Sequence, residues 1–192
     1  MANVTPIPTL LTDPGFLFSA PLGSTLPTMT VAGSVFTDAW PVAWINLGAT
    51  ADGTDFSYDI STSPIAVAEF LDPIKQAVTG RTSALAFELA NFTATNLKKV
   101  LNGATATVTG ATTTTLTKLT PPAPGQETRV MIGFESLDAT FRLVAYQCIN
   151  SGSIKVSFKK SPAYSTQPCV FQLEVPTTGT PVEFWTAGTT RA

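Results

Sequence analysis

Residues 65–103 read IAVAEFLDPIKQAVTGRTSALAFELANFTATNLKKVLNG, and they decide the fold because their periodicity changes from that of a strand to that of a helix. Within residues 83–89, the apolar side chains of Leu85, Phe87 and Leu89 alternate with small or polar ones. Successive side chains of a strand point to opposite faces of the sheet. The alternation therefore predicts a strand with one buried face.

Residues 93–102 have the apolar spacing of one short amphipathic helix. Thr93 is a suitable N-cap, because its side-chain oxygen can accept a hydrogen bond from the first turn. Asn102 and Gly103 form a typical stop signal at the other end. We expect the helix to pack on the face of a sheet through Phe92, Leu97, Val100 and Leu101.

The rest of the chain indicates strands, with Thr, Gly and Pro spaced throughout. A length of 192 residues suits a single domain with one core. We therefore predict one mainly β domain, an antiparallel β-sandwich or barrel with one flanking helix. The expected further strands are residues 30–45, 54–60, 65–71, 127–135, 141–150, 153–160, 169–175 and 181–185.

Charged residues make up 12% of the chain, about half the usual fraction. A surface with so few charges and so much apolar area indicates that part of it is buried in contacts with other copies of the chain. A monomer with a neutral, Thr-rich surface is the alternative. No apolar run approaches the ~20 residues that span a membrane, and we expect no signal peptide and no membrane association.

The charges are divided unevenly along the chain. Residues 1–74 contain seven acids and no base, which gives −7, whereas residues 75–192 contain six acids and eleven bases, which gives +5. Opposite faces of a subunit built from these halves would favour head-to-tail contact between copies. Alternatively, residues of the two halves lie side by side in the fold, and their opposite charges leave no charged face.

Three segments are expected to lie outside the regular body. Residues 1–30 are rich in Pro and predict an extended arm, with docking on a neighbour through Phe16, Leu17 and Phe18; a partly ordered leader is the alternative. Residues 47–53 predict a turn before the strand at 54–60; the alternative is that residues 46–64 form a long loop that becomes ordered only against a partner. Residues 104–126 predict a peripheral hairpin and a Pro-rich linker.

The sequence offers little that could perform catalysis. It has no His, which removes the usual general base and most catalytic zinc sites. The carboxylate pairs Glu69/Asp72 and Glu135/Asp138 are candidates for a glycosidase, but solvated acids beside turns are the commoner reading. Asp52, Asp55 and Asp59 lack the spacing of a calcium-binding loop. We expect no enzymatic activity, metal or cofactor.

Two further groups invite a binding function. Trp40, Trp44 and Trp185 could form a platform for a sugar, although packing in a core or interface is the favoured role. A basic patch for nucleic acid would need more than the small group formed by Lys155, Phe158, Lys159 and Lys160. The cysteines, Cys148 and Cys169, lie in expected strands and predict two reduced, buried thiols in a cytosolic product.

A resemblance to a known family covers roughly residues 40–103. Its motifs are Trp44-Ile-Asn-Leu-Gly48, Glu69-Phe-Leu-Asp-Pro73, Ala86-Phe-Glu-Leu-Ala-Asn-Phe-Thr93 and Asn96-Leu-Lys-Lys-Val-Leu-Asn-Gly103. In these motifs the chain resembles the major tail tube proteins of bacteriophages with long, non-contractile tails. The resemblance implies a β-sandwich with one helix, whose copies form hexameric rings that stack into a tube for DNA ejection. It also implies a structural protein of the virion, made in the cytoplasm of the host bacterium.

The resemblance implies a stacking loop at about residues 47–64 that bridges successive rings. Its candidate residues are Asp52, Asp55, Phe56, Tyr58 and Asp59. The implied partners are further copies, the tape measure, tail terminator and distal tail proteins, and DNA that passes without specific binding. The alternatives are a carbohydrate-binding β-sandwich, a capsid decoration protein and a tail terminator.

Overall fold

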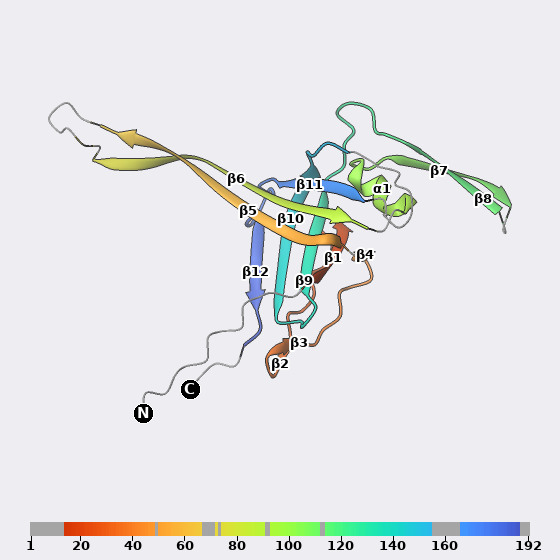
Figure 1. The fold of residues 1–192 in the computed structure, drawn as a ribbon, viewed down its shortest axis with the longest axis horizontal. Helices are drawn as coiled ribbons and strands as arrows, with labels where there is room; N and C mark the ends of the chain where they lie inside the picture. The colour runs from red at the N-terminus through yellow and green to blue at the C-terminus, as the bar shows by residue number, and fades with distance from the viewer. Residues whose placement is uncertain are drawn as a thin grey trace.

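The computed structural model describes residues 14–48, 50–66, 72, 74–90, 93–111, 114–154 and 166–188. In this part of the chain the fold is an antiparallel β-sandwich with one helix, as predicted (Figure 1). Its elements are β1 (Gly15–Pro21), β2 (Val31–Ala32), β3 (Val35–Phe36), β4 (Ile45–Gly48), β5 (Thr50–Ile65), β6 (Lys75–Leu89), α1 (Ala94–Val100), β7 (Thr105–Ala111), β8 (Thr114–Thr120), β9 (Val130–Ser136), β10 (Phe141–Asn150), β11 (Gln167–Leu173) and β12 (Val182–Thr186).

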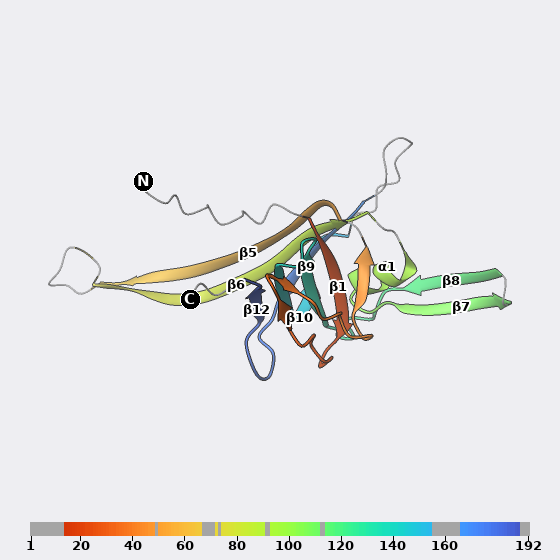
Figure 2. The ribbon, with the colours of Figure 1, turned by 90° about the horizontal axis from the view of Figure 1, so that it is seen from below.

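The main sheet has the order β4-β1-β9-β10-β11-β6-β5, and β12 pairs with β10 off this path. The first half of β10 pairs with β12, and its last residues pair with β11. Figures 1 and 2 show that β5, β6 and β11 cross over the strands β1, β9, β10 and β12. The sheet therefore bends through β10 and β11 into two layers, and the core lies between them.

The core is filled by the alternating residues that the sequence singles out. Leu85, Phe87 and Leu89 of β6 are buried, which confirms the predicted face. The rings of Phe87 and Phe171 stack with their centroids 5.7 Å apart. Each such fully buried side chain contributes roughly 1.5–3 kcal/mol of transfer free energy, so this seam between β6 and β11 is a main source of stability.

Helix α1 begins and ends as predicted. The Thr93 side chain accepts a hydrogen bond from the Asn96 backbone N–H at 3.1 Å. At the other end Asn102 and Gly103 have φ values of 52° and 92°, the left-handed backbone that stops a helix. Val100 is buried against the sheet, so the helix lies against the body through its apolar side.

Two expectations for the first 45 residues are wrong. Residues 15–21 are not part of an arm but form β1, an internal strand between β4 and β9. Pro14 and Pro21 lie outside or at the end of this strand, so the ladder loses no interior donor. Residues 30–45 are not one strand, because a turn at Gly33, with φ of 67°, separates the short β2 and β3.

Later strands agree with the sequence within a few residues at their ends. The expected strands at 127–135, 141–150, 169–175 and 181–185 correspond to β9, β10, β11 and β12. The peripheral hairpin predicted within 104–126 is confirmed as β7 and β8. Of the strands expected at 65–71 and 153–160, residues 67–71 and 155–160 lie outside the described residues.

Candidate functional site

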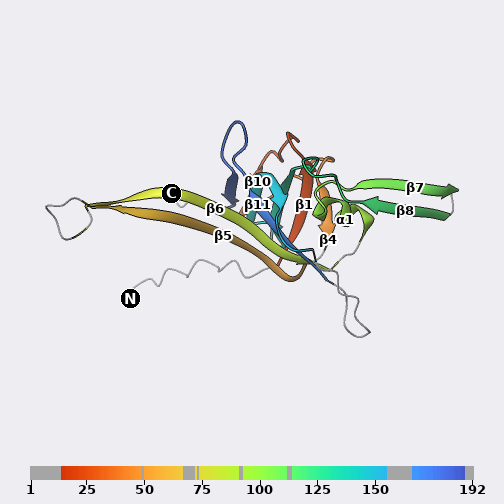
Figure 3. The ribbon, with the colours of Figure 1, turned by 90° about the horizontal axis from the view of Figure 1, so that it is seen from above.

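The most unusual feature of the molecule is the pair of hairpins that project from its body. The β5–β6 hairpin extends from one side and the β7–β8 hairpin from the opposite side (Figures 1 and 3). The outer part of the β5–β6 hairpin has large apolar side chains in solvent: Tyr58 is 48% exposed, Ile60 50% and Val78 53%. No other described element covers this part of the hairpin.

One face of the β5–β6 hairpin continues the core into solvent. Phe56 pairs with Leu85 in register, and its ring lies 5.1 Å from that of Phe184. Tyr58 and Ile60 follow at intervals of two residues and point to the same side of the strand. The apolar stripe of β5 therefore begins in the core and ends on an uncovered surface, where Arg81 of β6 lies opposite Ile60.

The opposite face of this layer is acidic. Asp55 and Asp59 of β5 point away from the core, and Glu88 of β6 lies on the same side. Their neighbours on this face are small or neutral, namely Ser57, Ser61, Thr82, Ala84, Ala86, Pro168, Val170 and Gln172. Over these described positions the face carries three carboxylates and no Lys or Arg.

The structure brings the candidate stacking residues together on one strand rather than in a loop. Asp52, Asp55, Phe56, Tyr58 and Asp59 all lie in β5. Phe56 and Tyr58 point to the apolar face, whereas Asp55 and Asp59 point to the acidic one. The predicted strand at 54–60 is confirmed within β5. The alternative of one long loop at 46–64 is wrong, because the Ser- and Thr-rich second half of this segment pairs with β6 as far as Ile65.

A groove of about 790 Å³ lies on the side of the body from which β7 and β8 extend. Its apolar lining comes from the ends of β1, β4 and β9, with Pro21, Leu22, Ile45 and Val130. The rest of the lining comes from α1, with Thr95, Lys98 and Lys99, and from Gly103, Glu127, Thr128 and Arg129. The sheet wall of the groove is thus apolar, and the α1 wall is polar.

Two lysines of this groove have no carboxylate partner. Lys99 Nζ donates to the hydroxyl and to the backbone carbonyl oxygen of Ser19, the latter at 3.4 Å. Burial, and then the neighbouring charge of Lys98, hold the pKa of Lys99 below its usual value. In the part of the chain that the structure describes, neither lysine forms an ion pair, whereas Arg129 pairs with Glu174 at 3.1 Å.

A buried arginine organises the end of the sandwich away from the groove. The Arg142 side chain is 1% exposed; its Nη1 lies 3.2 Å from Asp38 Oδ2 and its Nη2 lies 3.3 Å from Glu135 Oε1. The guanidinium also lies 4.8 Å from the centre of the Phe36 ring. These contacts hold the connection between β1 and β4 against the sheet.

Asp38 completes this arrangement from the connection itself. Its carboxylate accepts hydrogen bonds from the backbone N–H groups of Met29 at 3.0 Å and Thr30 at 2.9 Å. Burial opposes ionisation, but these backbone hydrogen bonds and the charge of Arg142 together hold the pKa of Asp38 below its usual value. Sequence reasoning missed this site, since the two charges are far apart along the chain.

The predicted carboxylate pair Glu135/Asp138 has structural partners. Glu135 accepts from Trp40 Nε1 and pairs with Arg142. Asp138 accepts from the Thr140 hydroxyl at 2.8 Å within the turn between β9 and β10. Hydrogen bonds from Ser136 and Thr140 lower the pKa of Asp138, against the effect of burial. Of the other pair, Glu69 lies outside the described residues.

The tryptophans do not form an open platform. Trp44 is buried, and its Nε1 donates to the Thr25 carbonyl oxygen at 2.9 Å. Trp40 lies between Phe18 and Trp44, with ring centroids 4.6 and 4.8 Å away. Trp185 packs partly buried against the same cluster. This arrangement is that of a second core and gives no support to a sugar site.

The expected docking residues of the arm also belong to the body. Leu17 is fully buried in the main core and Phe18 stacks on Trp40. Only Phe16 has a large exposed surface. The prediction that these side chains reach a neighbour is therefore wrong for Leu17 and Phe18, because β1 is an internal strand.

The helix packs through fewer apolar residues than predicted and through more polar ones. Val100 is buried, Leu97 and Leu101 are half-buried, and Phe92 lies outside the described residues. The unexpected contact is Asn96, whose Nδ2 donates to the Leu47 carbonyl oxygen at 2.7 Å.

A second polar contact joins the helix end to β10. Asn150 Nδ2 donates to the Val100 carbonyl oxygen at 2.8 Å, and its backbone N–H donates to Asn102 Oδ1 at 2.9 Å. Buried side chains that satisfy backbone groups fix one orientation of packed elements. The sequence contained Asn96 and Asn102 but gave no sign of their partners.

Within the described residues, no group of three or more Asp, Glu or Cys side chains is placed so that it could hold a metal ion. Asp52, Asp55 and Asp59 therefore do not form a metal site. Cys148 and Cys169 are free and buried, which confirms the expected thiols. Burial raises the pKa of each thiol to about 12. The basic residues Lys155, Lys159 and Lys160 lie outside the described part of the chain.

Comparison with protein-family models and with curated proteins finds no match for this chain. Among the described residues, no helix is long and apolar enough to cross a membrane.

Proposed function

We propose that the protein is a structural subunit that assembles with copies of itself into stacked rings, as the tail tube of a long, non-contractile bacteriophage tail. The proposal gives the chain no catalytic role. The observation that carries it is the β5–β6 hairpin, which extends beyond the body with an apolar stripe uncovered. Burial of this apolar stripe against a partner surface is more favourable than its exposure to solvent.

The physical argument concerns the stability of a two-stranded ribbon. An isolated two-stranded hairpin is at best marginally stable in water, and β5 is also an edge strand with unpaired backbone groups. Soluble proteins usually shorten or cover such edges. Assembly would cover both the edge and the apolar stripe at Tyr58 and Ile60.

The acidic face supports the more specific form of the proposal, a conduit for DNA. Asp55 and Glu88 lie on the part of this face that adjoins β11, and no base accompanies them at the described positions. Phosphates bind proteins mainly through Lys and Arg. A lumen lined by this face would repel the phosphate backbone, and DNA would pass without being held.

The proposal extends to location and partners. The rings would be hexameric and part of a virion assembled in the cytoplasm of a host bacterium. Besides further copies, the partners would be the tape measure, the tail terminator and the distal tail protein. No described feature favours the carbohydrate-binding alternative, because Trp40, Trp44 and Trp185 pack within the molecule.

Electron microscopy of the concentrated protein tests the proposal. We expect rings or tubes from the full chain. A trimmed variant that joins Tyr58 to Ser83 through a short Asn-Gly turn would remove the outer hairpin and keep the core pair of Phe56 and Leu85.

The trimmed variant should keep its circular dichroism and its cooperative unfolding but form no tubes. Tubes of normal length from the trimmed variant would exclude the hairpin as the assembly element. A full chain that stays monomeric at every concentration, and is missing from the tail of intact virions, would refute the proposed function itself.

A further inference from the structure

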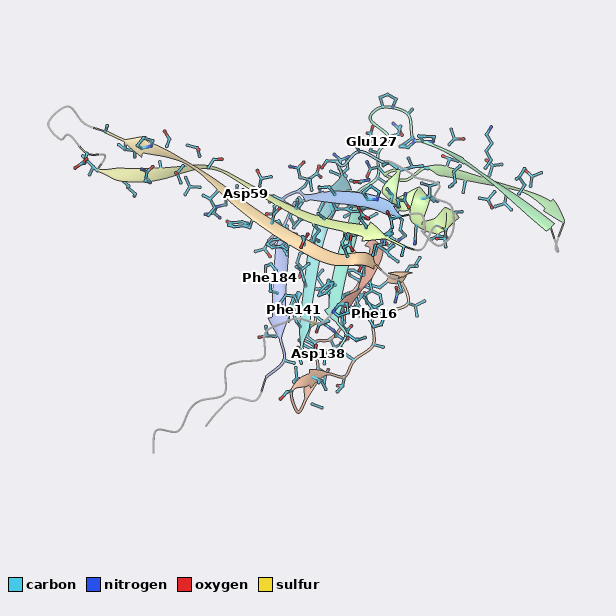
Figure 4. All side chains as sticks on the ribbon, viewed as in Figure 1. Phe16, Asp59, Glu127, Asp138, Phe141 and Phe184 are labelled. Carbon is cyan, nitrogen blue, oxygen red and sulfur yellow. The ribbon has the colours of Figure 1, made fainter. Side chains whose placement is uncertain are left out.

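The uncovered hairpin and the open groove lie on opposite sides of one molecule. In Figures 1 and 3 the β5–β6 hairpin extends from one side of the body, and α1, which lines the groove, lies on the other. Figure 4 labels Asp59 on the hairpin and Glu127, which also lines the groove. The hairpin cannot reach the groove of its own chain. Contact between the two would join unlike surfaces of different copies, as in a head-to-tail assembly.

The two walls of the groove differ in chemistry, and so do the two faces of β5. Leu22 and Ile45 expose apolar side chains on one wall, and Lys98 is exposed on the wall formed by α1. A strand that lies in a groove presents alternate side chains to opposite walls. In β5 these alternate sets are Tyr58 and Ile60 on one face and Asp55 and Asp59 on the other.

We infer that the groove between α1 and the β1–β4 end of the sheet is the receiving site for strand β5 of a second copy. Tyr58 and Ile60 lie against Leu22 and Ile45, and Asp59 lies toward Lys98. This inference rests on the proposed function. It identifies the surface of the neighbouring subunit that binds the hairpin.

Charge complementarity is what selects β5 as the occupant. Strand β5 carries three Asp residues and no base. None of its carboxylates forms an ion pair with another described residue, and the same holds for Lys98 and Lys99 in the groove. Docking would give Asp59 and Lys98 each a partner of opposite sign. It would also cover the exposed apolar side chains of both surfaces at once.

Cross-linking between copies tests the geometry. The chain would carry Ile60→Cys and Leu22→Cys, two substitutions at half-exposed positions, and assembled protein would be treated with a short bismaleimide. The native thiols are buried and should not react. The matched control joins Ile60→Cys with Val108→Cys on β7, which is exposed and outside the groove.

We expect a ladder of covalent dimers, trimers and larger species from the first variant only. A ladder no stronger than that of the control, in samples where tubes are visible, would overturn the docking site and leave the proposed function standing. A full chain that forms no assembly at any concentration, and is missing from the tail of intact virions, overturns both.

Reversal of charge tests the chemistry independently. Lys98→Glu should raise the concentration needed for assembly by about tenfold or more, because it places like charges together. Adding Asp59→Lys to the same chain should restore assembly. Lys118→Glu, at an exposed lysine of β8 outside the groove, is the control and should change that concentration by about twofold at most.

The folding of each charge-reversal variant is checked by circular dichroism. If one of these variants does not fold, the cross-linking experiment alone tests the inference. Equal effects of Lys98→Glu and Lys118→Glu, or no restoration by Asp59→Lys, would contradict the inference.

Discussion

Arg142 Nη1 lies 3.2 Å from Asp38 Oδ2, and this ion pair joins a strand of the central sheet to a connection more than a hundred positions earlier in the chain. Since only 1% of the Arg142 side chain is exposed, its charge depends on Asp38 and Glu135 for compensation. Removal of one member of a buried pair leaves an uncompensated charge, which is more costly than the loss of a surface pair.

We therefore expect Asp38→Ala to lower the free energy of unfolding by about 3–5 kcal/mol, measured by denaturant titration. The pair of Arg129 and Glu174, whose side chains are 38% and 32% exposed, supplies the control. Glu174→Ala should cost about 1 kcal/mol or less. A similar cost for both variants would show that the burial of Arg142 does not matter to stability.

Acid should destabilise the protein through the same group. Because the pKa of Asp38 is lowered in the folded state, its contribution is fully present above the ordinary value of 3.8 and is lost as the pH falls through the folded pKa. With no His in the chain, the free energy of unfolding should stay nearly constant from about pH 8 to 5 and then fall. The fall should be smaller in Asp38→Asn. An equally steep fall in that variant would assign acid sensitivity to other carboxylates.

Gly133 should not tolerate a side chain. A Cβ at this position would collide with the ring of Trp40 and touch that of Trp44. Gly133→Ala should cost about 1–3 kcal/mol through overpacking, and less in a Trp40→Leu background, because the two sites are in contact. Gly188→Ala is the control, since nothing lies within 4 Å of its added Cβ. Thermal unfolding of the four variants measures these differences.

The thiols should be inert in the folded protein. Burial raises the pKa of Cys148 and Cys169 to about 12, and only the thiolate is an effective nucleophile. At pH 8 a colorimetric thiol reagent should react with neither cysteine until denaturant unfolds the chain, and then with both. Rapid reaction of the native protein would mean that the two strands open locally.

The features that were predictable depend on contacts between residues close in sequence. The alternation around Phe87 and the cap at Thr93 are local signals, and both gave the correct element. The Thr-rich hairpin of β7 and β8 was predictable for the same reason. Fold class followed from these local periods.

The features that were not predictable depend on partners distant along the chain. Proline-rich flanks hid β1, because the sequence does not reveal that Pro14 and Pro21 fall at its ends. The alternation at residues 54–60 predicts part of β5, but residues 61–65 are rich in Ser and Thr and carry no core signal, so the full length of the pairing with β6 is not predictable. The partners of Arg142 and Asn96 become visible only when the strands are in place.

The two hairpins of this molecule are different from each other, and they extend in opposite directions. A filament made by placing β5 of each copy in the groove of the next would have polarity. At one terminus a groove would stay empty, and at the other a hairpin would stay bare. A new copy would add through its hairpin at one terminus and through its groove at the other, so each terminus would need a capping protein of its own kind.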